Sequence, residues 1–222
     1  MLTLQGHTRA VWWGMFFPDG QQVLTASSDN NLKLWSAASG ECVRSLQAFT
    51  RAVWSGVFSP NGQTVLTPAR DNIAKLRSAS SGKGVRNLYG HRGAVLSAVF
   101  SPDGQQVLTA SKDGTAKLWS AASGKSVQTL EGHRAQVQSG VFSSDGQLVL
   151  TASHDGAAKL WWAASGECVR TLQGHRGAVL SAVFSPQGQL GSMGRRAFSP
   201  RAALQPHARR NLYYTIDGFG HR

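Results

Sequence analysis

The sequence predicts an all-β protein made of repeated, four-stranded antiparallel units. Three observations predict this class: one segment recurs along most of the chain, tight-turn residues interrupt it about every ten positions, and hydrophobicity between the turns has the period of a strand. Hydrophobic residues make up 41% of the 222 residues and charged residues 15%. This is the composition of a folded chain that is long enough to bury a core.

A Gly-His pair marks the start of each repeat. Pairs stand at 6–7, 90–91, 132–133 and 174–175, and a degenerate Ala-Phe pair stands at 48–49, so the spacing is 42 residues throughout (90 to 132, 132 to 174). Self-similarity at one fixed period is typical of repeat architectures. We therefore expect a repeat domain over 1–190, with four full repeats and the start of a fifth, and a basic, disordered, non-repeating tail over 191–222. Within the tail, NLYYTI at 211–216 is the one candidate strand.

Four strands and three tight turns are expected in each unit. In the third unit the turns read Pro-Asp-Gly, Lys-Asp-Gly and Ala-Ser-Gly, and such triplets favour a sharp reversal of the chain. The strands expected there are 94–100, 106–111, 115–119 and 126–130. Four short strands every 42 residues describe one blade of a radial β architecture.

A spaced motif accompanies the Gly-His pair. An Asp follows the His after 22 residues, and a Trp follows the Asp after six: His7, Asp29 and Trp35; His91, Asp113 and Trp119; His133, Asp155 and Trp161. With this motif the chain resembles the WD-repeat β-propeller family over residues 1–189. The resemblance implies a partial or open propeller with about four complete blades. The Asp that usually follows the Trp in the family is replaced here by Ser or Trp.

The resemblance implies a buried hydrogen-bond network in each intact unit, in which the Asp carboxylate accepts bonds from His, Thr and Trp. Its members are His7, Thr25, Asp29, Trp35, His91, Thr109, Asp113, Trp119, His133, Thr151, Asp155 and Trp161. An ionised carboxylate only accepts and the other three groups can donate, so a structural role is chemically complete. His, Thr and Asp together would also suit a hydrolase, but a nucleophile is not needed in several copies. We expect no catalytic residue and no enzyme activity.

The second unit departs from this pattern. Phe49 replaces its His and Arg77 replaces its Trp, while Thr67 and Asp71 remain, and Pro68 is expected to interrupt its second strand. Loss of partners around a buried acid typically costs on the order of 1–3 kcal/mol. The second blade is therefore expected to be the weakest.

When the repeats are aligned, two positions (columns) vary while the rest are nearly constant: the residue after the first-strand Val and the residue before the network Asp. An Arg also stands one or two residues after each Gly-His or Ala-Phe pair, and we call these residues the Arg ring. The resemblance places these positions on the top face of the propeller, where partners usually dock, and Trp and Arg are frequent interface anchors. A solvated, drifting rim is the alternative interpretation. The predicted partner-binding residues are Arg9, Trp12, Arg51, Trp54, Arg70, Arg92, Leu96, Lys112, Arg134, Gln138, His154 and Arg176.

The resemblance implies a non-enzymatic protein-protein interaction scaffold. The near-identical, evenly spaced units also resemble a slice of a longer WD-repeat sensor array. The alternative is a nucleic-acid-binding module that uses the Arg ring and the basic tail, because the net charge is +12. Residues 191–222 carry six Arg and one acid, Asp217, and so contribute five of these charges. The repeat region is only mildly basic, which favours a protein partner.

Other classes of site lack their signatures. No Gly-rich phosphate loop, cysteine cluster or His-Glu-x-x-His motif occurs, so no cofactor or metal is expected. No secretory signal and no apolar run of membrane length occur, and Cys42 and Cys168 lack metal or redox spacing, so we expect a soluble protein of the cytoplasm or nucleus. Open blade edges would also favour self-association.

Overall fold

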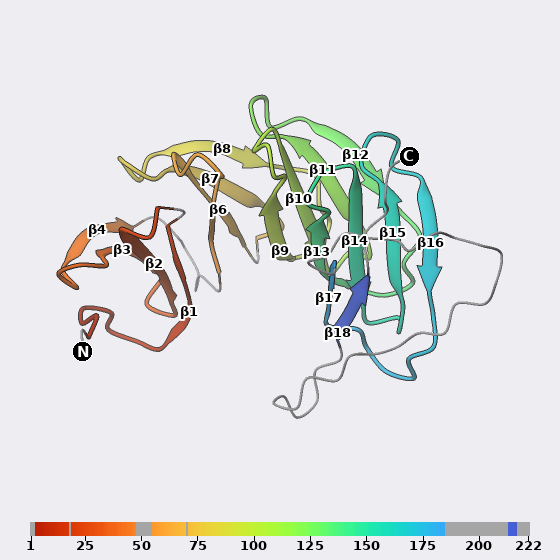
Figure 1. The fold of residues 1–222 in the computed structure, drawn as a ribbon, viewed down its shortest axis with the longest axis horizontal. Helices are drawn as coiled ribbons and strands as arrows, with labels where there is room; N and C mark the ends of the chain where they lie inside the picture. Colours follow the sequence, from red (N-terminus) through yellow and green to blue (C-terminus); the bar gives the residue numbers. More distant parts are fainter. Residues whose placement is uncertain (1–2, 18, 48–54, 70, 185–212, 217–222) are drawn as a thin grey trace.

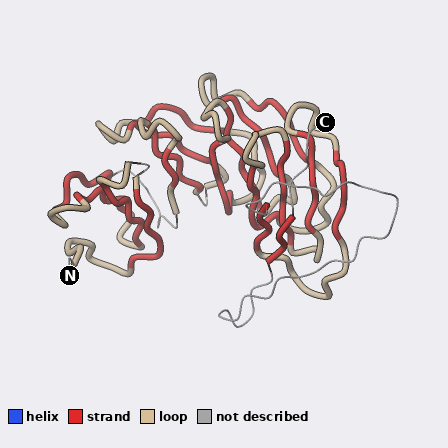
Figure 2. Tube along the Cα trace, in the orientation of Figure 1, coloured by secondary structure: helices blue, strands red, loops and turns tan. Residues whose placement is uncertain are grey.

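The structure is a computed structural model that describes residues 3–17, 19–47, 55–69, 71–184 and 213–216 (Figure 1). All the regular secondary structure in these ranges is β-strand. Figure 2 shows the strands joined by loops and turns. None of the described segments forms a helix that could cross a membrane.

Sixteen of the strands form four antiparallel sheets, which we call blades one to four. Blade one contains β1 (Val11–Phe16), β2 (Gln22–Ser27), β3 (Asn31–Ser36) and β4 (Cys42–Gln47). Blade two contains β5 (Val57–Phe58), β6 (Thr64–Pro68), β7 (Ala74–Ser78) and β8 (Gly84–Leu88). Blade three contains β9 (Val95–Phe100), β10 (Gln106–Ser111), β11 (Ala116–Ser120) and β12 (Ser126–Leu130). Blade four contains β13 (Val137–Phe142), β14 (Leu148–Ser153), β15 (Ala158–Trp162) and β16 (Cys168–Leu172).

Each blade is formed by one repeat, with its strands paired in sequence order. This confirms the predicted all-β class and the four-stranded antiparallel blades. The strands expected in the third unit agree with β9 to β12 to within one residue at each end. One expectation is wrong: Pro68 does not interrupt the second strand of its unit but is the last residue of β6, opposite Ala74. A proline is tolerated at the end of a strand, where the loss of its N–H breaks little of the ladder.

The turns need residues that adopt positive φ. Gly114 (φ 84°) and Gly156 (φ 82°) occupy the turn between the second and third strands of blades three and four, and Asn30 (φ 67°) and Asn72 (φ 68°) occupy it in blades one and two. Asn is the residue that best replaces Gly in this conformation, because its short side chain can bond to the local backbone. The turn chemistry read from the sequence therefore holds even where the Gly is lost.

The hydrophobic core lies between successive blades. Between blades two and three, Leu66, Leu76 and Leu88 pack with Val107 and Trp119, and each of these side chains is at most 2% exposed. Burial of a side chain of this size typically contributes about 1.5–3 kcal/mol. A blade is thus stabilised chiefly by its neighbours, as in other repeat proteins.

The blades follow one another along an open arc (Figure 1). At one end, the side of blade one that faces away from blade two is uncovered: Val11 is 51% exposed, whereas the equivalent Val95 of blade three is 4% exposed. At the other end, β17 (Ser181–Phe184) begins the fifth repeat and packs on blade four. β18 (Tyr213–Ile216), within the candidate strand of the tail, pairs with β17 in parallel.

Candidate partner-binding face and its supporting network

A chain of hydrogen bonds links four side chains in blade three. His91 Nδ1 lies 2.8 Å from Asp113 Oδ2, and His91 Nε2 lies 2.7 Å from Thr109 Oγ1. Trp119 Nε1 donates to the same Thr109 Oγ1 at 2.8 Å. The order is therefore Asp–His–Thr–Trp, and the expected arrangement, in which Asp accepts from all three, is wrong. The imidazole has a nitrogen on each side of its ring, so it bridges the carboxylate in the turn and the hydroxyl on β10.

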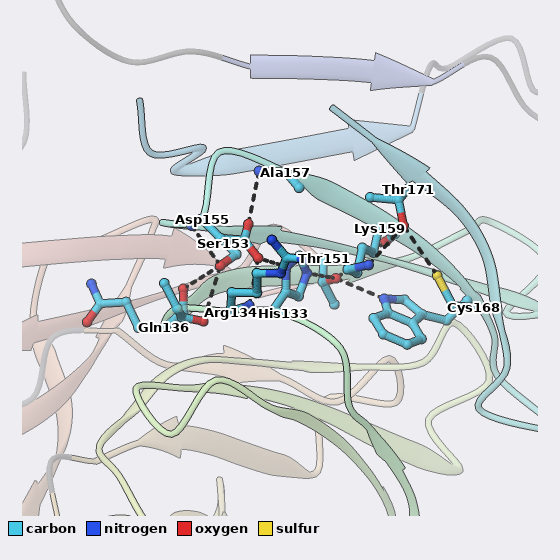
Figure 3. A network of polar contacts seen from close by, with 12 residues as sticks. His133, Arg134, Gln136, Thr151, Ser153, Asp155, Ala157, Lys159, Cys168 and Thr171 are labelled. Atoms are coloured by element: carbon cyan, nitrogen blue, oxygen red, sulfur yellow. Dashed lines mark hydrogen bonds and ion pairs between the residues drawn. The ribbon is translucent and has the colours of Figure 1, made fainter. Parts of the chain in front are cut away.

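Blades one and four repeat this network. His7 lies 2.7 Å from Asp29 and 2.8 Å from Thr25, and Trp35 donates to Thr25 at 2.7 Å. Figure 3 shows the copy in blade four, in which His133 lies between Asp155 (2.9 Å) and Thr151 (2.8 Å). Trp161 Nε1 donates to Thr151 Oγ1 at 2.9 Å. All twelve residues expected in the three networks are thus brought together in sets of four.

The protonation states of the network follow from its environment. Burial opposes ionisation of Asp113, but hydrogen bonds from Thr115, the Arg92 backbone N–H and His91 outweigh it and lower the pKa of the carboxyl to about 2. Burial lowers the pKa of His91, although the neighbouring Asp113 acts in the opposite direction. Near pH 7 a neutral imidazole therefore donates from Nδ1 to an ionised carboxylate and accepts from Thr109 at Nε2. Thr109 is 0% exposed and bonded on both sides, so no substrate can reach this hydroxyl.

Blade two uses different contacts. Lys75 Nζ forms an ion pair with Asp71 at 2.6 Å, and Arg77 donates to the carbonyl oxygen of Gly82 at 3.2 Å. Burial lowers the pKa of the Arg77 guanidinium. Thr67 remains, 0% exposed, with the Lys75 carbonyl oxygen 3.4 Å from its hydroxyl. The sequence analysis did not find the Lys75–Asp71 pair, although their separation of four residues across a tight turn is a usable signal. Phe49 lies outside the described residues.

In blade three the Gly of the Gly-His pair lies close to the network Trp. Gly90 has a φ of +148°, and a Cβ placed on it would lie 3.2 Å from Trp119 Cη2. The second repeat has Ala48 at this sequence position and Arg77 at the Trp position. The second repeat therefore lacks both residues of this Gly–Trp contact.

The Gly-His loops lie at one end of the blades, together with the turn between the second and third strands. In blade three, Lys112 N donates to Ala94 O at 2.9 Å, and Arg92 N donates to Asp113 Oδ2 at 2.8 Å, so the loop and the turn are bonded to each other. We call this end the upper face, and it comprises loops 6–10, 90–94, 132–136 and 174–178 with turns 28–30, 112–114 and 154–156. The lower face is the opposite end, with the first and third turns of each blade.

One variable column coincides with a β-bulge. In blade three, Val95 is opposite Ser111 and Ser97 is opposite Ala110, so Leu96 is the extra residue of the bulge. Trp12 and Gln138 take the same place in β1 and β13. A bulge re-aims a side chain at the end of a strand. Alignment of the repeats within this chain shows that this position varies, but only the strand register shows that it lies in a bulge, where the side chain can change without altering the ladder.

The predicted partner-binding residues fall into three groups. Leu96 and Gln138 are half-buried. Arg51, Trp54 and Arg70 lie outside the described residues. The others are exposed: Arg9, Trp12, Arg92, Lys112, Arg134, His154 and Arg176.

The predicted ring of Arg occupies two positions in the loop. Arg92 N and Arg134 N each donate to the network Asp of their blade, but Thr8 N makes this bond in blade one, at 3.1 Å. Arg9 therefore stands one residue further along the loop than Arg92. Within the described residues, no three His, Cys, Asp or Glu side chains lie together as metal ligands would.

Comparison with known proteins agrees with this geometry. The family model described as "WD domain, G-beta repeat" (WD40) matches residues 1–36, 40–78, 82–120, 124–161 and 166–195. The WD repeat-containing protein RUP2 of Arabidopsis thaliana is 50% identical over 44 residues, which are 20% of this chain and 12% of that protein. The chain thus aligns with only a small part of this relative. Five successive repeat matches, together with four four-stranded blades of which three carry the family's motif, show that the chain belongs to the WD40 repeat family.

Proposed function

We propose that this chain is a non-enzymatic scaffold that binds partner proteins on its upper face. The observation that carries the proposal is the bulge column, in which Trp12, Leu96 and Gln138 replace one another on a nearly constant frame. Trp12 is 53% exposed, so folding does not depend on a fully buried indole there. WD40 domains in general mediate protein-protein interactions, which supports the coarser part of this proposal.

The network beneath this face supports a binding role. In blades one, three and four it ties the Gly-His loop to the second and third strands through side chains that are almost fully buried. A loop held in this way loses little conformational entropy when a partner binds. The variable side chains are therefore presented on a pre-organised surface.

A pair of matched variants tests the proposal. Trp12→Ser removes an exposed indole from the upper face, and Trp162→Ser removes one that is 40% exposed at the lower end of β15. Loss of an interface anchor typically costs about 2 kcal/mol or more, or roughly thirtyfold in affinity. Quantitative affinity capture should show proteins whose recovery falls with Trp12→Ser and not with Trp162→Ser, at equal melting temperatures. Unchanged recovery of every captured protein with Trp12→Ser would contradict the proposal.

We propose that residues 1–190 contain this binding function and that the basic tail, 191–222, is dispensable for it. The same capture experiment with residues 1–190 and with the full chain checks this division. Loss of the captured proteins from a folded 1–190 chain would instead assign them to the tail.

The uncovered side of blade one favours a second activity, self-association. Phe16 is 63% exposed there, whereas the equivalent Phe100 and Phe142 pack against the preceding blade. We propose that a second copy of the chain covers this side. Sedimentation should then show a concentration-dependent mass that Phe16→Ser lowers and Val127→Ser, at an exposed outer-strand position, does not. A constant monomer mass would exclude it.

A further inference from the structure

The charged side chains are divided unevenly between the two ends of the blades. On the upper face, the described cations are all exposed: Arg9, Arg92, Lys112, Arg134 and Arg176. The exposed acids at this end are Glu131 and Asp71, and Asp71 forms an ion pair with Lys75. On the lower face, the described acids are exposed, with two lysines among them: Asp19, Glu41, Asp103, Asp145 and Glu167, with Lys83 and Lys125.

Three network carboxylates also lie at the upper end, beneath the cations. The side chains of Asp29, Asp113 and Asp155 are 4%, 11% and 11% exposed. Each accepts hydrogen bonds from a histidine and from backbone N–H groups, so these charges are occupied from within the blade. They do not offer a partner an accessible anion.

Four of the upper cations form a continuous series across blades three and four. Arg92 and Lys112 flank the same carboxylate, since Arg92 N is bonded to Asp113. The turn at 112–114 lies against the loop at 132–136 of the next blade, because a Cβ on Gly114 would lie 3.5 Å from Ala135 O, beside Arg134. We call Arg92, Lys112, Arg134 and Arg176 the basic arc.

The arc continues from blade four into the fifth repeat by the same contact. Arg134 N is bonded to Asp155, and His154 precedes this Asp. A Cβ on Gly156 would lie 2.9 Å from His175 O and 3.3 Å from Gly177 O, the residues on either side of Arg176. In the part of the chain that the structure describes, no side chain of the basic arc forms an ion pair.

We infer that the upper face binds an acidic protein segment, whose carboxylates pair with the basic arc while an apolar side chain lies on Leu96. This inference rests on the proposed function and specifies its partner. Arg holds a carboxylate through two parallel hydrogen bonds, so spaced acids match spaced arginines. Apolar and amide side chains, Leu96 and Gln138, occupy the bulges of the same blades, which suits a polypeptide of mixed acidic and apolar residues.

A nucleic acid fits this surface less well. Its phosphates form an uninterrupted anionic series, and the exposed carboxylate of Glu131, three residues before Arg134, would repel one of them. A peptide can place its carboxylates on the cations and a neutral residue beside Glu131. The charge pattern therefore favours the peptide.

A labelled peptide of repeating Glu-Glu-Leu is the probe, and fluorescence anisotropy with the full chain is the measurement. Lys112→Gln with Arg134→Gln removes two charges from the basic arc. The matched control, Lys83→Gln with Lys125→Gln, removes two exposed charges from the lower face. The first pair should weaken binding by about fivefold or more, and the control should change it by less than about twofold.

Three results would overturn the inference. The first is equal binding of the probe and of its Gln-Gln-Leu counterpart, and the second is equal weakening by both double variants. The third is tighter binding of oligothymidylate than of the peptide, lost with Lys112→Gln and Arg134→Gln, which would make the arc a nucleic-acid surface. If the acidic probe fails while Trp12→Ser still impairs protein capture, only the acidic chemistry is refuted and the scaffold function stands.

Discussion

Replacing the network threonine tests whether the Asp–His–Thr–Trp chain stabilises its blade. Thr109 Oγ1 bonds His91 Nε2 at 2.7 Å and Trp119 Nε1 at 2.8 Å, and the residue is 0% exposed. Thr109→Val keeps the volume and removes the hydroxyl, which leaves a buried imidazole nitrogen and a buried indole N–H without a partner. Each such group costs about 1–3 kcal/mol, so the variant should lose about 3 kcal/mol of unfolding free energy.

Blade two supplies the matched control. Thr67 is equally buried, but its hydroxyl faces only the Lys75 carbonyl oxygen at 3.4 Å and has no histidine or tryptophan beside it in the described residues. Thr67→Val should therefore cost less than about 1 kcal/mol.

Thermal unfolding measures the difference between the two variants. About 3 kcal/mol corresponds to roughly 6–12 °C for a chain of this size. Because repeat arrays need not unfold in one step, amide exchange in β10 should be measured as a local readout. Equal effects of the two substitutions would refute the role assigned to the hydroxyl.

Three further predictions follow from the same contacts. The pKa of His91 and that of Asp113 are lowered on folding, so the unfolded chain binds more protons than the folded chain. The free energy of unfolding should therefore be full above about pH 6.5 and fall on acidification, first through the histidine range and then toward pH 2, as denaturant titration at several pH values would show. Gly90→Ala should cost about 1–3 kcal/mol through its φ and its contact with Trp119, whereas Gly84→Ala, with open space around its Cβ, should not. Amides of β6 and β7 should exchange faster than those of β10 and β11, and equal protection would contradict a weaker blade two.

Much of the fold could be predicted because its determinants are local. The period of 42 residues, the Gly-containing turns and the alternation of apolar positions predict four strands per unit, and β9 to β12 follow those limits closely. The error at Pro68 has a local cause as well, since the sequence does not show that this residue ends a strand. The Lys75–Asp71 pair leaves a signal in the sequence, a separation of four residues across a tight turn, that the search for the family's motif did not use.

The sequence by itself determined the repeat and the positions that vary, because these are properties of residue type and spacing, and its resemblance to the WD-repeat family supplied the membership of the three networks. Tertiary structure decided how the groups are connected. The imidazole of His91 stands between the Asp113 carboxylate and the Thr109 hydroxyl because the loop, the turn and β10 converge in space. Only strand register shows that Leu96 lies in a bulge, and only the apposition of one blade's turn with the next blade's loop joins Arg92 to Arg176 in one arc. A single sequence records the residues of each repeat, but contacts between repeats depend on how the blades pack.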